Sequence, residues 1–369
     1  MKVLYFTRTQ SPHDLRFTQA LADTEHQVFV LCLEPVLGRQ WPGNIVEIDW
    51  QGINPNNIGQ TLIEQMEWLK AVVERINPDI IHAGPIQTAA YYSAKVGFHP
   101  LVAMSWGSDL LVDAEENPFS QFVTRYTLER TDVLVGDCAC VGKKAELLGF
   151  TGSNYFQFPW GVELQHFSPH GSAALREKLG WQDKTVLLSS RSFSPLYGVD
   201  VLLAAFAAAI IENPELRLLL FGKGPLESQF RQFVIDHDLV DNVHFGGQAS
   251  LEELPDIYRS ADVYLSASHS DGSSVSLMEA LACGLPVVVS DIPGNLEWVT
   301  EGQQGWLFKD GDAKEFAQKI LLAASQLRGL EAMKTGNRAL AEQRADWKKN
   351  FPILLKAYET AINVVESND

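Results

Sequence analysis

The sequence has few cysteines, no long apolar run and no excess of basic residues, and each absence excludes a class of protein. Its 369 residues include only four cysteines, Cys32, Cys138, Cys140 and Cys283, and none of them forms a C-x-x-C pair. A disulfide scaffold or cysteine-rich metal site is therefore not expected, and we interpret the four as reduced thiols in a cytoplasmic protein. Cys138 and Cys140 flank one residue, a spacing too tight to predict a disulfide.

No apolar stretch approaches the roughly 20 residues that a membrane-spanning helix requires. The apolar run from Val199 to Ile211 is too short, and Asp200 lies near its start. The N-terminal sequence MKVLYFTRTQ has only a four-residue apolar run before Thr7, whereas a signal peptide needs a longer apolar core. We therefore expect a soluble protein.

Basic residues are outnumbered, with 29 Lys and Arg against 46 Asp and Glu, a formal net charge of −17. This balance argues against a nucleic-acid partner, which needs a basic surface to displace counterions. It also disfavours docking on anionic lipid by bulk charge, although it leaves peripheral membrane contact through a local basic patch open. The length of 369 residues predicts two domains rather than one.

The most informative stretch runs from Asp271 to Ser290 and reads DGSSVSLMEALACGLPVVVS. Ser276 and Glu279 have the S-x-x-E spacing of a capping box, which predicts that a helix begins there. Gly284 and Pro286 would end this helix. The β-branched run 287–289 that follows is typical of a strand buried on both faces of a parallel sheet.

The start of this stretch favours a bound phosphate. Gly272, Ser273 and Ser274 are small, so backbone N–H groups could face a ligand, and a helix N-terminus favours negative charge. Asp271 and Glu279 would then bind neutral hydroxyls beside the phosphate. The alternative is that Glu279 is merely the capping-box carboxylate and the serines are ordinary loop and cap residues.

The stretch resembles the signature of retaining glycosyltransferases of family 4 (glycosyltransferase group 1). In that signature two acidic residues eight apart flank a Gly-containing loop, and E-A-x-A-x-G-x-P-V-V follows; residues 279–288, EALACGLPVV, match without a gap. The first acidic position is usually Glu and is Asp271 here. The resemblance implies an α/β GT-B fold, with two Rossmann-like doubly wound domains facing across a cleft and the nucleotide-sugar on the second.

Strand and helix patterns alternate along both halves, as a doubly wound sheet requires. Phe167-Ser168-Pro169 resembles the family's inter-domain linker. We therefore predict an acceptor-side domain at 1–168, a donor-side domain at 169–345 and a C-terminal helix at 346–369, which in this family usually crosses back to the first domain. Strands are expected at 3–7, 27–33, 79–82, 101–105, 131–135, 185–189, 216–221, 243–246 and 261–266, and helices at 15–22, 59–76, 142–148, from 199, 251–260, 313–327, from 333 and 351–365.

In the first half, two loops follow predicted strands and carry candidate residues. His13 lies in the first loop by position, because ligands of such sheets bind at the carboxyl ends of strands; a helix cap by Ser11 or Asp14 is the alternative reading of this loop. The second loop, 106–109, resembles a family segment that reads H-G-x-D. Trp106 stands where the His usually lies and Asp109 is retained, so the resemblance places both near the reacting sugar. The alternative is that Trp106 fills the core.

In the second half, the resemblance assigns donor contacts. Arg191 matches an Arg that grips the diphosphate, and Tyr197 stands where some members have a Lys. Lys223 lies in a G-x-G-P turn near the donor, and the loop at Gly246 brackets the nucleobase. A surface ion pair for Arg191 and a solvated Lys223 are the alternatives. The same turn is not a dinucleotide fingerprint, because its third glycine is replaced by Glu227.

The resemblance to the family implies a role for each of the candidate residues. The resemblance implies that Arg191 and the amides of the loop hold the diphosphate, that Glu279 holds the ribose hydroxyls, and that Asp271 holds the sugar hydroxyls. The predicted catalytic residues are Asp271, Trp106, Asp109 and His13; the predicted donor-binding residues are Arg191, Tyr197, Lys223, Gly246, Gly272, Ser273, Ser274, Val275, Ser276 and Glu279.

We therefore expect a retaining glycosyltransferase that moves a sugar from a UDP- or GDP-linked donor to a hydroxyl of a glycan, lipid-linked or small-molecule acceptor. No D-x-D pair is placed to hold a metal, so neither a metal nor a cofactor is expected. The departures at Trp106, Tyr197 and Asp271 leave one alternative open, a non-catalytic member that binds a nucleotide-sugar or glycan. An epimerase or a dehydrogenase on the same plan is disfavoured, because the glycine fingerprint is absent.

Overall fold

A computed structural model of the chain describes residues 1–36, 38–50, 62–152 and 154–367. The chain divides into two compact units. Unit 1 comprises Met1–Phe158 and Phe351–Asp369, and unit 2 comprises Pro159–Asn350. The sequence placed the corresponding boundaries near Ser168 and at 345.

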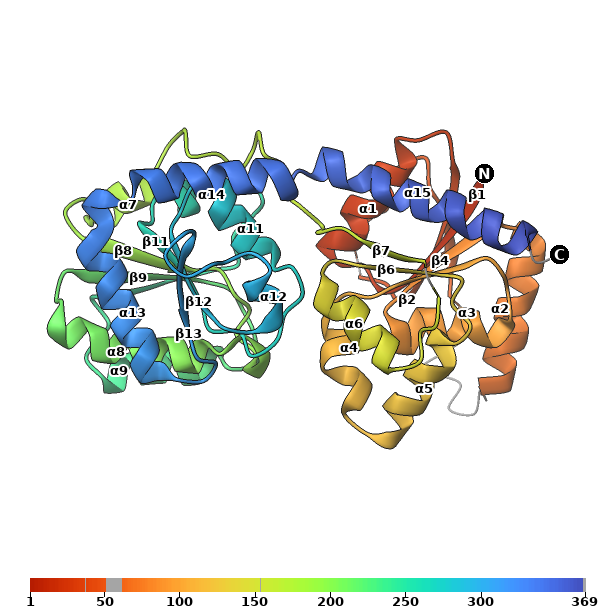
Figure 1. The fold of residues 1–369 in the computed structure, drawn as a ribbon, viewed down its shortest axis with the longest axis horizontal. Helices are drawn as coiled ribbons and strands as arrows, with labels where there is room; N and C mark the ends of the chain where they lie inside the picture. The colour runs from red at the N-terminus through yellow and green to blue at the C-terminus, as the bar shows by residue number, and fades with distance from the viewer. Residues whose placement is uncertain (37, 51–61, 153, 368–369) are drawn as a thin grey trace. The chain divides into compact units, whose positions relative to one another are not determined.

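Unit 1 is built on a seven-stranded sheet in the order β3-β2-β1-β4-β5-β6-β7, and every neighbouring pair is parallel (Figure 1). A parallel sheet needs a crossover between successive strands, and helices supply most of these connections. The strands are β1 (Lys2–Thr9), β2 (Gln27–Glu34), β3 (Val46–Asp49), β4 (Ile80–Gly84), β5 (Leu101–Met104), β6 (Val133–Gly136) and β7 (Tyr155–Gln157).

The helices of unit 1 are α1 (Pro12–Ala22), α2 (Leu62–Ile76), α3 (Tyr91–Val96), α4 (Ser108–Leu111), α5 (Pro118–Leu128) and α6 (Ala139–Leu147), with a π-helical turn at Ile86–Ala90 and a 3₁₀ turn at Asp113–Glu115. The alternative reading of the first loop, a helix cap by Ser11 or Asp14, is confirmed, because the two residues form a reciprocal capping box at the start of α1. The helix predicted over 59–76 is described from Leu62, and residues 51–61 lie outside the described residues.

Unit 2 is built on a six-stranded parallel sheet in the order β10-β9-β8-β11-β12-β13 (Figure 1). Its strands are β8 (Thr185–Ser189), β9 (Leu216–Phe221), β10 (Val243–Gly247), β11 (Val263–Ser266), β12 (Val287–Ser290) and β13 (Gly305–Phe308). Its helices are α7 (Ala174–Lys178), α8 (Val199–Glu212), α9 (Glu227–Asp236), α10 (Leu254–Arg259), α11 (Val275–Ala282), α12 (Pro293–Leu296), α13 (Ala313–Gln326) and α14 (Glu331–Arg344), with 3₁₀ turns at Pro195–Tyr197 and Leu327–Gly329.

The sheet of unit 2 is covered on both faces. Leu218 and Leu220 of β9 face a core that includes α8 and α13, whereas Leu219 and Phe221 face a second core that includes α10 and α11. Because successive side chains of a strand point to opposite faces, a strand between two helical layers must be apolar throughout. The prediction of two doubly wound α/β domains is confirmed.

The last helix, α15 (Trp347–Glu366), begins in unit 2 and continues into unit 1. Within unit 1 it is attached to the sheet through Tyr358, whose hydroxyl lies 2.5 Å from Nδ1 of His82 on β4, and both side chains are buried. Among the described residues, none of the helices combines the length and the apolar character needed to cross a membrane.

Candidate functional site

The carboxyl ends of the strands in unit 2 gather most of the predicted donor-binding residues. Arg191 follows β8, Lys223 follows β9, Gly246 lies at the end of β10, and Asp271 follows β11. These strands are parallel, so their ends meet at one edge of the sheet. This edge is where ligands bind in doubly wound sheets.

Arg191 is the centre of a polar network at this edge. Its Nη1 donates to Ser274 Oγ at 2.7 Å and to Ser276 Oγ at 2.9 Å, and its Nη2 donates to Asp271 Oδ2 at 2.5 Å. The side chain of Arg191 is only 9% exposed and that of Asp271 is 22% exposed. The structure therefore places Arg191 in a buried ion pair with Asp271, rather than on the surface.

The guanidinium of Arg191 is held in its charged form. Burial is the largest single influence and acts to lower the pKa of Arg191, but the charge of Asp271, the neighbouring Tyr264 and Tyr197 and the hydrogen bond to Asp271 together outweigh it and leave the pKa above its ordinary value. The ring of Tyr197 adds a cation–π contact, with its centroid 4.2 Å from the Arg191 Cζ atom. The face of the Tyr197 ring thus stabilises the positive charge of Arg191, and the sequence did not indicate this contact.

The serines after Asp271 are engaged in the same network. Ser274 is the N-cap of α11, and its Oγ accepts from Leu277 N at 3.4 Å. Ser276 Oγ lies 2.7 Å from the hydroxyl of Tyr264 as well as beside Arg191. The predicted capping box is therefore wrong: the N-cap is Ser274, two residues before Ser276, and the helix begins at Val275, while Ser276 contacts Arg191 and Tyr264.

Ser273 is also fixed by a side chain from another part of unit 2. Its Oγ accepts a hydrogen bond from Trp298 Nε1 at 3.0 Å, and Ser273 is buried. Gly272 is buried beside it, and a side chain at Gly294 would overlap the Gly272 carbonyl oxygen. The loop 271–274 is therefore held in shape from two sides, before the first turn of α11, where amide groups have no partner within the helix.

Glu279 is buried on α11 and does not serve as a cap. Its Oε2 accepts a hydrogen bond from the Tyr258 hydroxyl at 2.7 Å. The same hydroxyl lies 2.8 Å from Ser190 Oγ, and burial followed by the charge of Glu279 raises the pKa of Tyr258 well above its ordinary value. Tyr258 therefore stays a neutral donor and fixes the orientation of the carboxylate. Nothing in the sequence linked this tyrosine to the site.

Glu279 lines a cavity of about 320 Å³ at the same edge of unit 2. Its lining residues are Ser190, Ser192, Phe221, Gly222, Lys223, Gln248, Ala249, Leu254 and Glu279. They offer hydroxyl, amide, cationic and carboxylate groups around an apolar wall, which suits a ligand with a flat apolar part and several polar groups. Gln248, Ala249 and Leu254 were not among the predicted donor-binding residues.

The turn after β9 is shaped by glycines that leave room for backbone. A side chain at Gly222 would overlap the Arg191 carbonyl oxygen, and one at Gly224 would overlap that of Phe193. Lys223 between them is exposed and lines the cavity. Gly246 is not among the lining residues of the cavity; the ring of Phe221, which does line it, occupies the space that a side chain at Gly246 would need.

In unit 1, Trp106 and His13 lie together. Their rings are stacked at a centroid distance of 6.0 Å and an angle of 28°, and Phe17 packs edge-on against Trp106 at 5.9 Å. Both Trp106 and His13 are half-buried. Trp106 is thus not simple core filler, and the two rings form a partly exposed aromatic face at the carboxyl ends of β1 and β5.

Both carboxylate oxygens of Asp109 accept hydrogen bonds from neighbouring groups within unit 1. Its Oδ1 accepts from Ser105 Oγ at 2.6 Å and from Leu110 N at 3.0 Å, and its Oδ2 accepts from Ile86 N at 3.0 Å. Burial raises the pKa of Asp109, and these hydrogen bonds act in the opposite direction. Gly107 has φ of +92°, which only glycine adopts at low cost. Asp109 therefore shapes the loop that carries Trp106.

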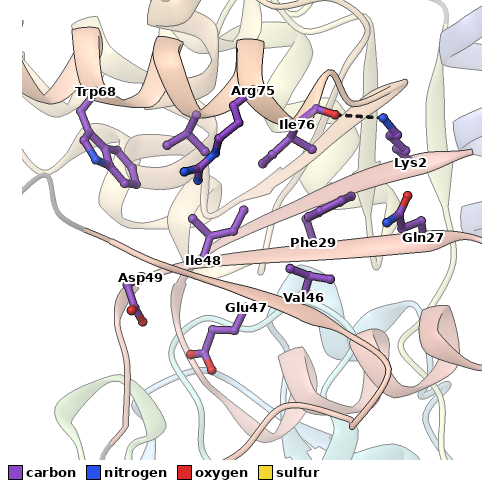
Figure 2. Close-up of a pocket in the computed structure, with 11 residues that line it drawn as sticks. Lys2, Gln27, Phe29, Val46, Glu47, Ile48, Asp49, Trp68, Arg75 and Ile76 are labelled. Atoms are coloured by element: carbon purple, nitrogen blue, oxygen red, sulfur yellow. Dashed lines mark hydrogen bonds between the residues drawn. The ribbon is translucent and has the colours of Figure 1, made fainter.

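A second and larger cavity, of about 580 Å³, lies in unit 1 between α2 and the strands β1 to β3 (Figure 2). Lys2, Gln27 and Val46, the first residues of these three strands, line it. It is therefore at the amino ends of the strands, away from the edge where ligands of such sheets bind. The smaller cavity in unit 2, at the carboxyl ends of the strands, is therefore the candidate ligand site.

Two family models match this chain and together span most of it. Residues 172–339 match "Glycosyl transferases group 1", and residues 2–137 match "Glycosyl transferase 4-like". The D-inositol 3-phosphate glycosyltransferase of Saccharomonospora viridis is 31% identical over 212 residues, covering 55% of this chain and 49% of that protein. The phosphatidyl-myo-inositol mannosyltransferase of Mycolicibacterium smegmatis is 31% identical over 213 residues, covering 57% and 53% respectively. The chain thus spans about half the length of the curated relatives it matches.

Solved structures resemble the whole chain. Anabaena HepE in complex with UDP-glucose has a TM-score of 0.80 at 19% identity, covering 98% of this chain and 99% of that one. The sucrose-phosphate synthase of Thermosynechococcus elongatus has a TM-score of 0.81 at 19% identity, covering 97% and 98% respectively. At this level of identity the likeness shows a shared fold.

Proposed function

Because the chain belongs to the group 1 glycosyltransferases and has their GT-B fold, we propose that it transfers a sugar from a nucleoside-diphosphate sugar to a hydroxyl group. The observation that carries the proposal is the cavity in unit 2, which is lined by Glu279, by Lys223 in the turn after β9, and by Ser190 and Ser192 after β8. A carboxylate that accepts two hydroxyls, next to a cationic turn, is suited to a ribose followed by a diphosphate.

The proposed donor contacts divide between the two ends of the cavity. Glu279, oriented by Tyr258, would accept from the ribose hydroxyls, while Phe221 and Gln248 would lie against the base. Lys223 and the first-turn amides of α11 would meet the diphosphate. We propose UDP or GDP as the nucleotide. UDP-glucose is named in the HepE complex and GDP-mannose in the name of a Corynebacterium glutamicum relative.

Arg191 and Asp271 would act as a pair at the diphosphate end. Oδ2 of Asp271 faces Arg191, so Oδ1 is the oxygen that would accept from a sugar hydroxyl. Arg191 would hold the loop 271–274 in place and add positive charge beneath the departing diphosphate, a form of fixed electrostatic stabilisation that needs no metal ion. The departing phosphate oxygen would take the acceptor proton on the same face of the sugar, which gives retention.

The proposed acceptor is a hydroxyl of a glycan, a lipid-linked glycan or a small molecule. Trp106 and His13 would offer it an aromatic face in unit 1. We propose that the protein acts in the cytoplasm, where nucleotide-sugars are made, and the net charge of −17 does not indicate docking on an anionic membrane.

Two observations favour the second candidate, a protein that binds a nucleotide-sugar without turning it over. Asp271 and Arg191 neutralise each other, and Trp106 replaces an imidazole that the family usually has. A binding protein would keep Glu279 and the cavity while losing the reacting groups.

Turnover decides between the two candidates. The protein is incubated with UDP- and GDP-sugars and a panel of hydroxyl acceptors, and the release of nucleoside diphosphate is measured. The transferase predicts acceptor-dependent release, with a product whose anomeric configuration, read by NMR, matches that of the donor. Binding of a nucleotide without release for any acceptor would support the binding protein, and an inverted product would contradict the retaining mechanism.

A further inference from the structure

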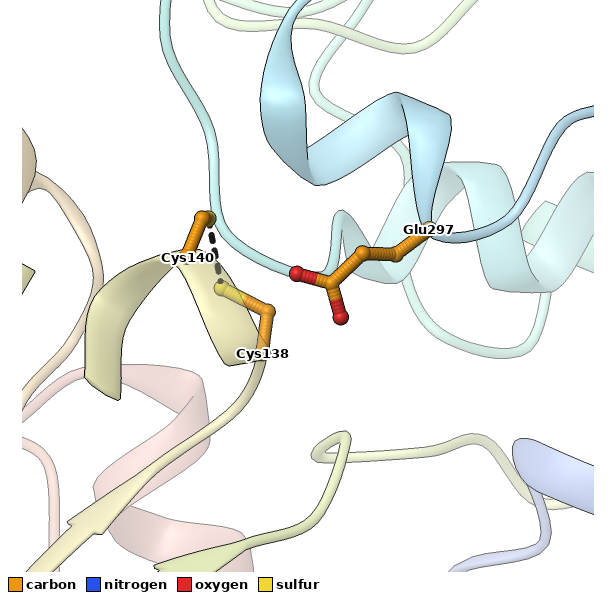
Figure 3. A group of neighbouring side chains, drawn as sticks. All are labelled: Cys138, Cys140 and Glu297. Carbon is orange, nitrogen blue, oxygen red and sulfur yellow. Dashed lines mark hydrogen bonds between the residues drawn. The ribbon is translucent and has the colours of Figure 1, made fainter. Parts of the chain in front are cut away.

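Two cysteines in unit 1 lie close together at the start of α6. The strand β6 ends at Gly136, Cys138 is the N-cap of α6 with φ of −152° and ψ of 161°, and Cys140 lies in the first turn. The two Sγ atoms are 3.1 Å apart (Figure 3). A disulfide bond, about 2.05 Å long, needs them only about 1 Å closer.

The two thiols differ in access. Cys138 is fully buried, whereas Cys140 is half-buried. The hydrogen bond with Cys140, followed by burial, raises the pKa of the Cys138 thiol. Cys138 therefore keeps its proton, and either sulfur can be the donor in the contact between the two thiols. Cys140 is the sulfur that a reagent from solvent would meet first.

The backbone around the pair is fixed. The Tyr155 hydroxyl donates to the Cys138 carbonyl oxygen at 2.5 Å. Gly136 and Gly142 make room for the Tyr155 ring, because a side chain at either position would overlap it. The two sulfur atoms are thus held near each other by the surrounding structure, and not by a flexible loop.

The other two cysteines provide a contrast within the same chain. Cys32 and Cys283 are both buried, and neither has another cysteine beside it among the described residues. Burial raises the pKa of Cys32 to about 11 and that of Cys283 to about 12. Neither thiol combines access from solvent with a neighbouring thiol.

We propose that Cys138 and Cys140 form a thiol–disulfide modification site that reacts with peroxides. The Cys140 sulfur attacks one peroxide oxygen, the O–O bond breaks, and the thiol proton leaves with the departing oxygen as water when the peroxide is H₂O₂. The Cys138 sulfur then attacks the Cys140 sulfenic acid, the S–O bond breaks, and the hydroxyl leaves with the Cys138 proton as a second water. The dithiol loses two electrons and the peroxide gains them, and a dithiol reductant reverses the change.

The test follows one peptide of the full-length protein. Trypsin cuts after Arg130 and Lys143, so residues 131–143 contain both cysteines and no others. The folded protein is treated with hydrogen peroxide, quenched in acid, alkylated after unfolding and digested. The proposal predicts that the mass of this peptide falls by two hydrogens and that it takes up no alkyl group. If dithiothreitol is added after the peroxide and before alkylation, the peptide should take up two alkyl groups.

Single variants separate the two roles. In Cys138→Ser, Cys140 should form a sulfenic acid that dimedone traps, and in Cys140→Ser the peptide should stay alkylatable at Cys138. The peptides that contain Cys32 and Cys283 serve as internal controls and should be alkylated with and without peroxide. Full double alkylation of 131–143 after peroxide, or equal loss of alkylation at all four cysteines, would overturn the proposal. The readout is a mass, so it is independent of the proposed transfer reaction.

Discussion

Arg191 donates to Asp271 across 2.5 Å in unit 2, and the two groups that the sequence assigned to different parts of the donor are partners of each other. The sequence placed Arg191 on the diphosphate and Asp271 on the sugar. The structure connects the two proposed roles, because the carboxylate proposed to hold the sugar also fixes the guanidinium proposed to meet the diphosphate.

Removing the carboxylate of this ion pair should destabilise the protein. Asp271→Ala leaves the buried Arg191 charge without its acidic partner, and we expect the free energy of unfolding to fall by about 3 kcal/mol. Urea denaturation measures it. Asp310→Ala is the matched control, because Asp310 pairs with His269 at a half-exposed site and should change stability by about 0.5 kcal/mol or less. Similar small changes in both variants would show that the Arg191–Asp271 pair does not stabilise the fold.

Glu279→Gln should weaken nucleoside-diphosphate binding. The change keeps the shape of the side chain but replaces a charged acceptor for the ribose hydroxyls and for Tyr258, so we expect the Kd to rise about tenfold or more. Isothermal titration calorimetry with UDP and GDP measures it. Glu252→Gln changes an exposed carboxylate outside the cavity lining and should leave the Kd unchanged. An unchanged Kd in Glu279→Gln would remove this residue from the nucleotide site.

Gly246→Ala should act on the cavity through Phe221. The new methyl group would meet the Phe221 ring, so the ring must move and the apolar wall of the cavity changes shape. We expect a rise in Kd for the nucleotide of several-fold. Gly336→Ala is the matched control: Gly336 is exposed within α14, no atom lies within 4 Å of the new methyl, and the free energy of unfolding should rise by about 0.5–1 kcal/mol. Loss of binding in both variants would contradict this account.

Trp106→Ala should affect the acceptor and not the nucleotide. If the indole stacks on the acceptor, its loss removes about 1 kcal/mol, which corresponds to a several-fold higher KM for the acceptor. The Kd for UDP or GDP should stay the same, because the predicted nucleotide site is in unit 2. Trp106→Phe keeps an aromatic ring and should raise the KM for the acceptor less than Trp106→Ala does. A changed nucleotide Kd with an unchanged acceptor KM would be the opposite of what we expect.

His82 should make stability depend on pH. Burial lowers the pKa of His82 to about 3, against an ordinary value of 6.5. Between these pH values the unfolded chain binds a proton that the folded chain does not. The contribution of His82 to the free energy of unfolding is therefore fully present above about pH 6.5, and the free energy falls by about 1.4 kcal/mol per pH unit toward pH 3. Denaturation of wild type and His82→Gln at several pH values measures the difference. His170→Gln, in an exposed loop, should keep the wild-type slope, and an equal slope in His82→Gln would contradict the assignment.

Much of the fold could be predicted from local patterns. The β-branched run 287–289 and the apolar runs before the loops at Arg191 and Lys223 gave their strands correctly, since a strand between two helical layers must be apolar. Short elements such as β7, β13 and α12 were not predicted, because three or four residues carry too little periodicity. The N-cap of α11 was placed two residues late, because two serines near a helix end both suit a cap and only their partners tell them apart.

The site was predictable in its residue types but not in its pairings. Arg191, Asp271, Ser274 and Ser276 were all named, yet their mutual hydrogen bonds join segments about 80 residues apart in sequence and depend on the sheet order. Tyr258 as the partner of Glu279 also depends on how the fold brings two separate elements together. The closeness of Cys138 to Cys140, which are two positions apart, depends instead on the local backbone at the start of α6. A local sequence pattern does not predict which hydroxyl group will donate to a given carboxylate, or which backbone conformation will bring two thiols together.

The central claim is that unit 2 binds a nucleoside diphosphate in the cavity lined by Glu279. The most direct measurement is thermal unfolding of wild type and Glu279→Gln with UDP, GDP and ADP, each over a range of concentrations. We predict that UDP or GDP stabilises the wild type by about 2.7 kcal/mol at a hundredfold excess over its Kd, and that Glu279→Gln needs about ten times more nucleotide for the same shift. The absence of a shift with every nucleotide, or an identical shift in Glu279→Gln, would contradict the claim.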